Sequence, residues 1–139
     1  RLGPGAALPP PEEFGGAWYL QRYVDTGADG HGSRDLRVLV VGGASVAAMI
    51  RHGAGWVSNV AQGARCEPCP PDPELDALAA AACAAVGADH AGVDLVRDRA
   101  GRLQVLEVNG IPAWRGLQTT TRVDIAGRVV ADFLDRRMG

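Results

Sequence analysis

The chain has 139 residues and is 47% hydrophobic, which is enough apolar material for one domain with a sizeable core. Its formal net charge of −2 and its aromatic content of 5% exclude the basic, aromatic-rich surface typical of nucleic-acid-binding proteins. The longest apolar run, 77–86, is too short for a membrane-spanning helix, which needs about 20 residues. We therefore expect neither nucleic acid nor a membrane as a partner.

The N-terminal 17 residues are rich in proline and glycine, a composition typical of an extended connector. We therefore interpret 1–17 as a linker and 18–139 as the folded domain. Because the chain starts with arginine, we expect it to belong to a longer parent. Residues 18–24, WYLQRYV, are aromatic and branched and predict a strand. The polar, glycine-rich residues 25–34 predict the loop that follows this strand.

A first hairpin is predicted by two apolar segments, 36–41 and 46–50, which flank Gly-Gly-Ala-Ser at 42–45. Around the first segment Asp35, Arg37 and Leu39 alternate with other residues and share one face. An arginine among branched apolar residues needs an anionic partner, and its bidentate guanidinium suits a phosphate or a carboxylate such as that of Asp35. The residues alone leave these two partners equally open.

The segment 51–65 contains small residues with little periodicity and predicts a loop, either a surface connection or a lid. Cys66 and Cys69 after it have the spacing of zinc ligands, but no second pair completes a four-ligand site. The third cysteine, Cys83, falls in a predicted helix. Three cysteines do not make a disulfide framework, so we expect a cytoplasmic protein.

Two helices are predicted by apolar residues at helical spacing. The first begins at Asp72 and Pro73, which have the characters of an N-cap and a first helical residue, and ends at Gly87. The second covers 123–138, and its expected buried stripe consists of Ile125, Val129, Val130, Phe133 and Leu134. Two hairpins and two helices predict an α+β fold in which an antiparallel sheet has helices packed on one side.

A second hairpin is predicted at 91–110, AGVDLVRDRAGRLQVLEVNG, with its turn at 98–101. This turn makes Arg97 face Arg102, and the alternation of side chains then defines two faces. The polar face contains Gly92, Asp94, Val96, Val105, Glu107 and Asn109. The apolar face, which we expect to be core, contains Ala91, Val93, Leu95, Leu106 and Val108.

The polar face of this hairpin predicts a metal site. Isolated acids on a strand ordinarily face water, but Asp94, Glu107 and Asn109 place three oxygen donors on one face. Carboxylate and amide oxygens are the ligands of hard cations, and magnesium keeps some waters and commonly bridges substrate phosphates. We therefore expect Mg²⁺ at these three residues, with Mn²⁺ as the alternative ion.

Five segments together resemble the C-terminal half of ATP-grasp ligases. They are DLRVLVVGG, the SN of VSNVAQG, AGVDLV, LEVNGIP and TTTRVDIAG, in the same order and at similar spacing as in that family. The resemblance is closest to the RimK-like α-L-glutamate ligases and covers the chain from about residue 18 to its end. It implies an ATP-grasp C-terminal subdomain, here as part of a longer ligase.

The resemblance implies a reaction in which ATP phosphorylates a carboxylate and an amine attacks the acyl phosphate, forming a carbon–nitrogen bond and releasing ADP and phosphate. It implies that Asp94, Glu107 and Asn109 bind magnesium and that Arg37 is catalytic, because it would hold the transferring phosphoryl group. The residues that the resemblance assigns to ATP are Gln21, Arg22, Tyr23, Val24, Ser58 and Asn59.

The resemblance implies ATP, a carboxylate substrate and an amine, most simply glutamate, as partners, and a homo-oligomer formed through the full-length parent. The acceptor is a protein or a small molecule, and IPAWRGLQ resembles relatives that glutamylate pterin cofactors at least as well as the others. Another peptide-bond-forming ATP-grasp ligase is an alternative of the same class. A nucleotide-binding or interaction module without catalysis is the alternative from a different class.

Overall fold

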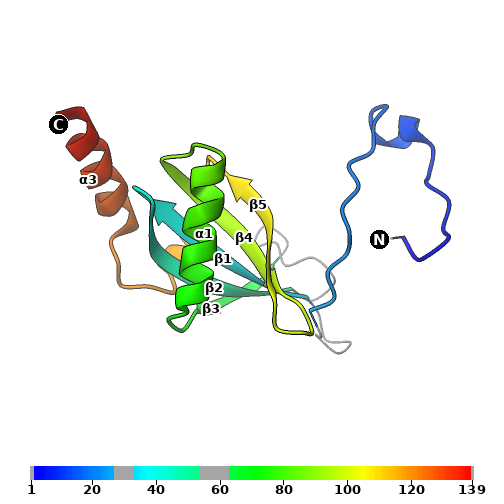
Figure 1. Ribbon diagram of the computed structural model, residues 1–139, viewed down its shortest axis with the longest axis horizontal. Helices are drawn as coiled ribbons and strands as arrows, with labels where there is room; N and C mark the ends of the chain where they lie inside the picture. The colour runs from blue at the N-terminus through cyan, green and yellow to red at the C-terminus, as the bar shows by residue number, and fades with distance from the viewer. Residues whose placement is uncertain (1, 27–32, 54–62, 139) are drawn as a thin grey trace.

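The protein folds around one antiparallel sheet. The computed structural model describes residues 2–26, 33–53 and 63–138, and within them the strands lie in the order β3-β2-β1-β4-β5 (Figure 1). The elements are η1 (Pro11–Phe14), β1 (Ser33–Val41), β2 (Ala44–Gly53), β3 (Arg65–Pro68), α1 (Pro73–Ala85), β4 (His90–Arg97), β5 (Leu103–Asn109), α2 (Arg115–Gln118) and α3 (Ile125–Met138). All neighbouring strands are antiparallel, which confirms the predicted α+β class.

The first hairpin forms as predicted, with a tighter turn. Gly42 and Gly43 have φ of 61° and 78°, and Val41 pairs with Ala44 across them. Two consecutive residues with positive φ make the two-residue turn whose twist matches a hairpin. The four-residue turn expected at 42–45 is therefore shortened, and an irregularity in register between Leu39 and Val40 accommodates the difference.

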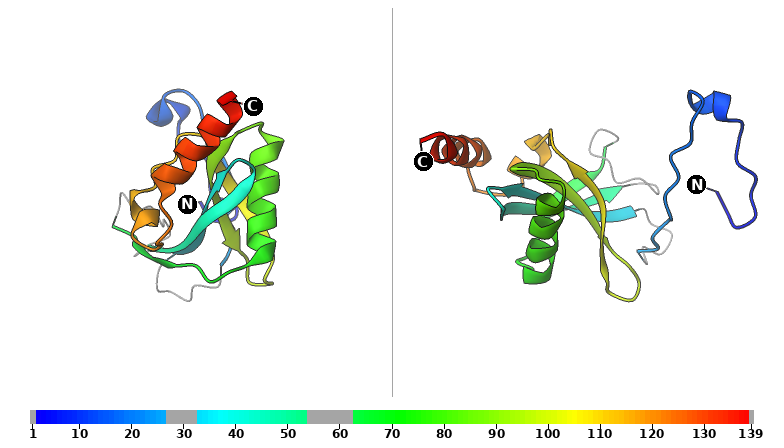
Figure 2. Two further views of the ribbon diagram at one scale, coloured as in Figure 1. Left: turned by 90° about the vertical axis from the view of Figure 1, so that its left-hand side faces the viewer. Right: turned by 45° about the horizontal axis from the view of Figure 1, so that its top comes forward.

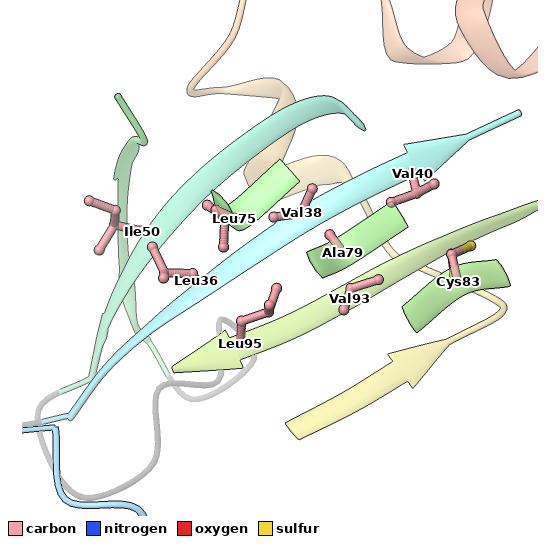
Figure 3. Packing of buried hydrophobic residues seen from close by; sticks show 10 residues of the cluster. Leu36, Val38, Val40, Ile50, Leu75, Ala79, Cys83, Val93 and Leu95 are labelled. Atoms are coloured by element: carbon pink, nitrogen blue, oxygen red, sulfur yellow. The ribbon is translucent and has the colours of Figure 1, made fainter. Parts of the chain in front are cut away.

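One face of the sheet packs against α1 to form the larger core (Figure 3). Leu75, Ala79 and Cys83 from α1 meet a layer of strand residues, namely Leu36, Val38, Val40, Ile50, Ala91, Val93 and Leu95. The helix begins as predicted, because the Asp72 carboxylate accepts hydrogen bonds from the backbone N–H groups of residues 74 and 75 at 3.1 Å. Gly87, with φ of 66°, follows its end.

The opposite face carries a second, smaller core at one end of the sheet. Leu117 of α2 and Ile125 of α3 pack there with Leu39, Val41 and Met49. Helices therefore contact both faces, whereas the sequence predicted one. The difference arises because Leu39 and Val41 alternate with the residues that meet α1 and present a second apolar surface.

The terminal helix is shorter than predicted, and its apolar contacts with the sheet come from its first two turns. Asp124 lies just before it and accepts a hydrogen bond from the N–H of Gly127 at 3.0 Å. Of the expected buried stripe, Ile125 is buried and Val129 partly so, while Val130, Phe133 and Leu134 are about half exposed. The later turns extend beyond the end of the sheet (Figures 1 and 2).

The strand predicted at 18–24 is wrong. These residues belong to no strand, and most are exposed, with Tyr19 at 86%. Aromatic and branched composition favours a strand only where a neighbouring strand completes the ladder. Residues 2–17 lie away from the sheet, with the short η1 turn in the segment that we predicted as a linker (Figures 1 and 2). In the described residues no helix has the length and apolar character needed to cross a membrane.

The cap of α1 can be tested by paired substitutions. Asp72→Ala should lower the free energy of unfolding by about 1 kcal/mol, because two backbone N–H groups lose their acceptor. The backbone hydrogen bond from Leu75 leads the contributions that lower the pKa of Asp72 from its ordinary 3.8. The stabilisation that the Asp72 carboxylate gives to the helix should therefore be present above about pH 4 and be lost as the pH falls further.

Asp72→Asn is the matched control, because asparagine caps a helix as well as aspartate does but has no charge for Arg97, which lies 2.8 Å from the carboxylate. Urea unfolding at neutral pH should show a smaller loss for Asp72→Asn than for Asp72→Ala. Equal losses would contradict this account and assign the stabilisation to the ion pair.

Candidate active site

The β4–β5 hairpin places the predicted polar residues on one face. Asp94 lies opposite Glu107, and Gly92 lies opposite Asn109. Residues directly opposite in an antiparallel pair project from the same side of the sheet. The predicted grouping of Asp94, Glu107 and Asn109 is therefore confirmed at the level of the backbone register.

The register of the whole hairpin differs from the prediction, in which Arg97 faces Arg102 and Asp94 would lie opposite Val105. Arg97 pairs with Leu103 and not with Arg102, and an irregularity follows Asp94. The turn is longer than expected because the Asp98 carboxylate accepts backbone N–H bonds from Ala100 and Arg102, both at 2.9 Å. As a result Val105 lies opposite Leu95 and packs on the α1 core, where we had expected Leu106.

Arg37 and Asp94 form a bidentate ion pair between neighbouring strands. The two residues are directly opposite in the β1–β4 register. The Nε of Arg37 donates to Oδ1 of Asp94, and Nη2 donates to Oδ2 at 2.8 Å. Each side chain is 11% exposed. The carboxylate partner of Arg37 is thus Asp94, and the alternative in which Asp35 has this role is wrong.

Asp35 has a different partner, Arg51, which the sequence analysis did not identify. Arg51 lies opposite Asp35 in the β1–β2 register and donates to both of its oxygens, at 2.6 and 2.8 Å. Its Nη2 also lies 3.0 Å from Oδ2 of Asp94. Arg51 was overlooked because we expected the loop to begin at 51, whereas β2 continues to Gly53. The available signal was the alternation of side chains along β2: Arg51 follows Met49 by two residues, so both project from the same face of the strand.

Burial and charge act against each other in this cluster of Asp35, Arg37, Arg51 and Asp94, which we call the charge cluster. Burial raises the pKa of Asp35 above its ordinary value, although the hydrogen bond and charge of Arg51 oppose this. Burial also tends to lower the pKa of Arg51, but the hydrogen bond to Asp35 and the nearby carboxylates outweigh it, so the net shift is upward. Arg51 therefore stays charged.

Gly92 provides the space in which the Arg37 side chain lies. A Cβ built at Gly92 would be 2.6 Å from Nη1 of Arg37 and 2.9 Å from Cβ of Pro112. Such a distance is too short for any real contact, and the neighbours would have to move. The glycine of AGVD thus brings the arginine of DLR and the proline of NGIP close together in the structure.

The oxygen donors suit a magnesium ion that also contacts a phosphate. Glu107 is exposed, and Oδ1 of Asn109 accepts the backbone N–H of Ile111 at 2.9 Å. Within the described ranges no three His, Cys, Asp or Glu side chains form a metal-binding group. Magnesium is typically bound by one or two carboxylates with waters and substrate phosphates completing the shell. Two carboxylates and one amide oxygen fit that pattern.

The residues that we assigned to ATP are only partly described. Nε2 of Gln21 donates to the carbonyl of Leu106 at 3.3 Å, and Nη2 of Arg22 donates to the side chain of Gln104 at 3.3 Å. Tyr23 is 45% exposed and Val24 is partly buried. This segment therefore lies beside β5. Ser58 and Asn59 fall outside the described residues.

The cysteines do not come together. Cys66 packs on the core beside α2 and α3, while Cys69 packs on the α1 side of the sheet. Residues three apart on an extended chain point to opposite sides, so the CEPC spacing does not bring the two thiols together on one face. Burial raises the pKa of the Cys69 thiol, which lowers its tendency to ionise and bind a metal.

The comparisons with known proteins agree with this geometry. Residues 16–133 match the model of the RimK-like ATP-grasp domain, so the chain belongs to this family of ATP-grasp proteins. It is 41% identical over 118 residues to the tetrahydromethanopterin:alpha-L-glutamate ligase of Methanocaldococcus jannaschii, covering 84% of this chain and 40% of that protein. It is 39% identical over 110 residues to a probable alpha-L-glutamate ligase of Parasynechococcus marenigrum, covering 78% and 23% respectively.

Solved structures show the same fold. D-cycloserine synthetase DcsG aligns with a TM-score of 0.60 at 25% identity, over 84% of this chain and 41% of that one. The ATP-grasp ligase PsnB, complexed with its minimal precursor, Mg and ADP, aligns with a TM-score of 0.56 at 25% identity, over 71% and 33%. The chain thus spans about 40% or less of the length of these relatives and structures.

The close approach of Arg37 and Pro112 at Gly92 can be tested with two glycine substitutions. Gly92→Ala should lower the free energy of unfolding by about 1–3 kcal/mol, because the added methyl group overlaps Arg37 and Pro112. Gly110→Ala is the matched control, since a Cβ there meets no atom within 4 Å. Urea unfolding of both variants measures the difference, and an equal effect of the two substitutions would contradict this close approach.

Proposed function

We propose that this chain is the magnesium- and phosphate-binding part of an ADP-forming carboxylate–amine ligase, with ATP as its nucleotide. The observation that carries the proposal is the pairing of Arg37 with Asp94 beside Glu107 on one face of the sheet. A largely buried arginine next to acidic oxygen donors suits the phosphate end of a nucleotide. Membership of the RimK-like ATP-grasp family supports the same assignment.

The reaction proposed is a two-step amide formation. The γ-phosphoryl group of ATP passes to a substrate carboxylate oxygen, which gives an acyl phosphate and ADP. The amine nitrogen then attacks the carbonyl carbon, phosphate leaves, the amine loses a proton, and the carbon–nitrogen bond forms. Arg37 would bind the phosphoryl oxygens during transfer, where a fixed positive charge stabilises the developing negative charge.

Asp94, Glu107 and Asn109 would hold magnesium in this assignment. When bound there, magnesium neutralises phosphate charge and aligns the transferring group. The PsnB structure with Mg and ADP supports magnesium and nucleotide use by a protein of the same fold. Residues 21–24, which lie beside β5, would contribute backbone groups to the adenine. For Ser58 and Asn59 the family resemblance alone supports an assignment to ATP.

The amine substrate that we propose is L-glutamate, because both relatives are named as alpha-L-glutamate ligases. For the acceptor, the pterin relative is the more similar of the two, and a pterin carboxylate is therefore our first candidate. An open hollow of about 580 Å³ lined by 112–115, Gln118 and Thr119 shares Pro112 with the surroundings of Arg37. Trp114 lines this hollow and offers a flat apolar surface.

Calorimetric titration with ATP and magnesium tests the proposed site. The wild-type chain should bind magnesium–ATP, and Glu107→Gln should lower the affinity by about tenfold or more, because a charged oxygen donor is replaced by a neutral one. Glu12→Gln in η1, which removes a carboxylate away from the sheet, is the charge-matched control and should bind like wild type.

Failure of the wild-type chain to bind magnesium–ATP would overturn the proposed site. Equal affinity of Glu107→Gln and wild type would also overturn it, because the nucleotide would then bind elsewhere. Circular dichroism of each variant confirms that the sheet and helices remain folded, so that a loss of binding reports on the site.

A further inference from the structure

Arg37 and Arg51 both contact the Asp94 carboxylate, but their other hydrogen-bond partners differ. Both hydrogen bonds of Arg37 in the described part of the chain end on Asp94. Arg51 has two hydrogen bonds to Asp35, at 2.6 and 2.8 Å, in addition to its 3.0 Å contact with Asp94. If Asp94 took another partner, Arg37 would lose its acceptors, whereas Arg51 would keep those of Asp35.

A cation that binds Asp94 must compete with Arg37. The Arg37 guanidinium occupies both oxygens of the carboxylate. The four residues of the charge cluster are electrically neutral together, and Glu107 adds one negative charge beside them. Adding a doubly charged cation while both arginines stay would leave an excess of positive charge. That excess would favour the arrival of an anion.

We propose that Asp94 exchanges partners, so that magnesium takes the oxygens that Arg37 now occupies, Arg37 turns to a phosphate group, and Arg51 keeps the carboxylate in position. This exchange rests on the proposed function. Asp35 supports it by anchoring Arg51. Because magnesium releases the arginine that phosphate needs, the two ligands bind cooperatively, and each tightens the other by a typical 5- to 150-fold. Arg51 is a positioning residue and touches neither reacting group.

Nuclear magnetic resonance of the arginine Nε–H groups can follow the exchange directly. Magnesium alone, then inorganic phosphate, is titrated into the 139-residue chain. The Nε–H signal of Arg37 should shift as magnesium binds and shift again with phosphate. The Nε–H signal of Arg51, which donates to Asp35, should move much less. The two arginines thus serve as each other's control within one sample.

Substitutions that keep or remove charge test the competition. Arg37→Gln should bind magnesium about tenfold more tightly than wild type without phosphate, because one competing cation is gone, and phosphate should no longer tighten that binding. Arg37→Lys keeps the charge and should stay nearer to wild type in both respects. Asp35→Asn should weaken magnesium binding, because Arg51 then turns fully to Asp94. A purely structural role of Asp35 would lower stability without changing the affinity of the folded protein.

The outcomes separate this exchange from the proposed site itself. If magnesium binds and Glu107→Gln abolishes that binding, the proposed site stands. The exchange is then overturned if the Arg37 signal does not move, or if Arg37→Gln leaves the affinity and the phosphate effect unchanged. If neither wild type nor Arg37→Gln binds magnesium, both the site and the exchange are overturned.

Discussion

The arrangement of the site depends on the ion pair between Arg37 of β1 and Asp94 of β4. Removing two charges from water is costly, and the cost is offset only when the geometry is good and further hydrogen bonds are present. The direct pairing of the two residues in the antiparallel register supplies the geometry. Asp35 and Arg51, paired in the same way across β1 and β2, supply the additional contacts.

The two faces of the sheet differ in what they carry, because one is entirely apolar where α1 packs and the other also carries the charge cluster. On one face α1 covers an apolar layer, which fixes the positions of β1 and β4 (Figure 3). On the other face, α2 and the beginning of α3 cover one end of the sheet, near Leu39 and Met49. The charge cluster occupies the same face through the alternation of β1, in which Asp35 and Arg37 precede Leu39. An apolar layer therefore supports the polar layer in which we propose that ligands exchange.

Local sequence patterns predicted much of the site because it is built from hairpins. The common face of Asp94 and Glu107 was predicted correctly although the turn is longer than expected, because the irregularity after Asp94 skips Leu106 and restores the expected alternation. The exchange of faces between Val105 and Leu106 was not predictable from the pattern, because it depends on how the Asp98 carboxylate organises the turn.

Other features depend on long-range contacts that a local pattern does not contain. Arg51 belongs to the site because β2 extends three residues past its predicted end and pairs with β1 as far as Ser33. The segment 18–24 has the composition of a strand but belongs to none, and the side chains of Gln21 and Arg22 donate hydrogen bonds to β5. The later turns of α3 have helical periodicity, yet Leu134 remains 48% exposed, because periodicity defines a face without specifying what covers it.

The central claim is that the charge cluster, together with Glu107 and Asn109, is the site where a hard cation binds. Manganese tests it most directly, because it accepts the same oxygen donors as magnesium and broadens the resonance signals of nearby nuclei. Addition of small amounts of manganese should first broaden the backbone amide signals of 92–94 and 107–109. Broadening that begins instead around Asp72 and Glu74, or that is uniform along the chain, would contradict the claim.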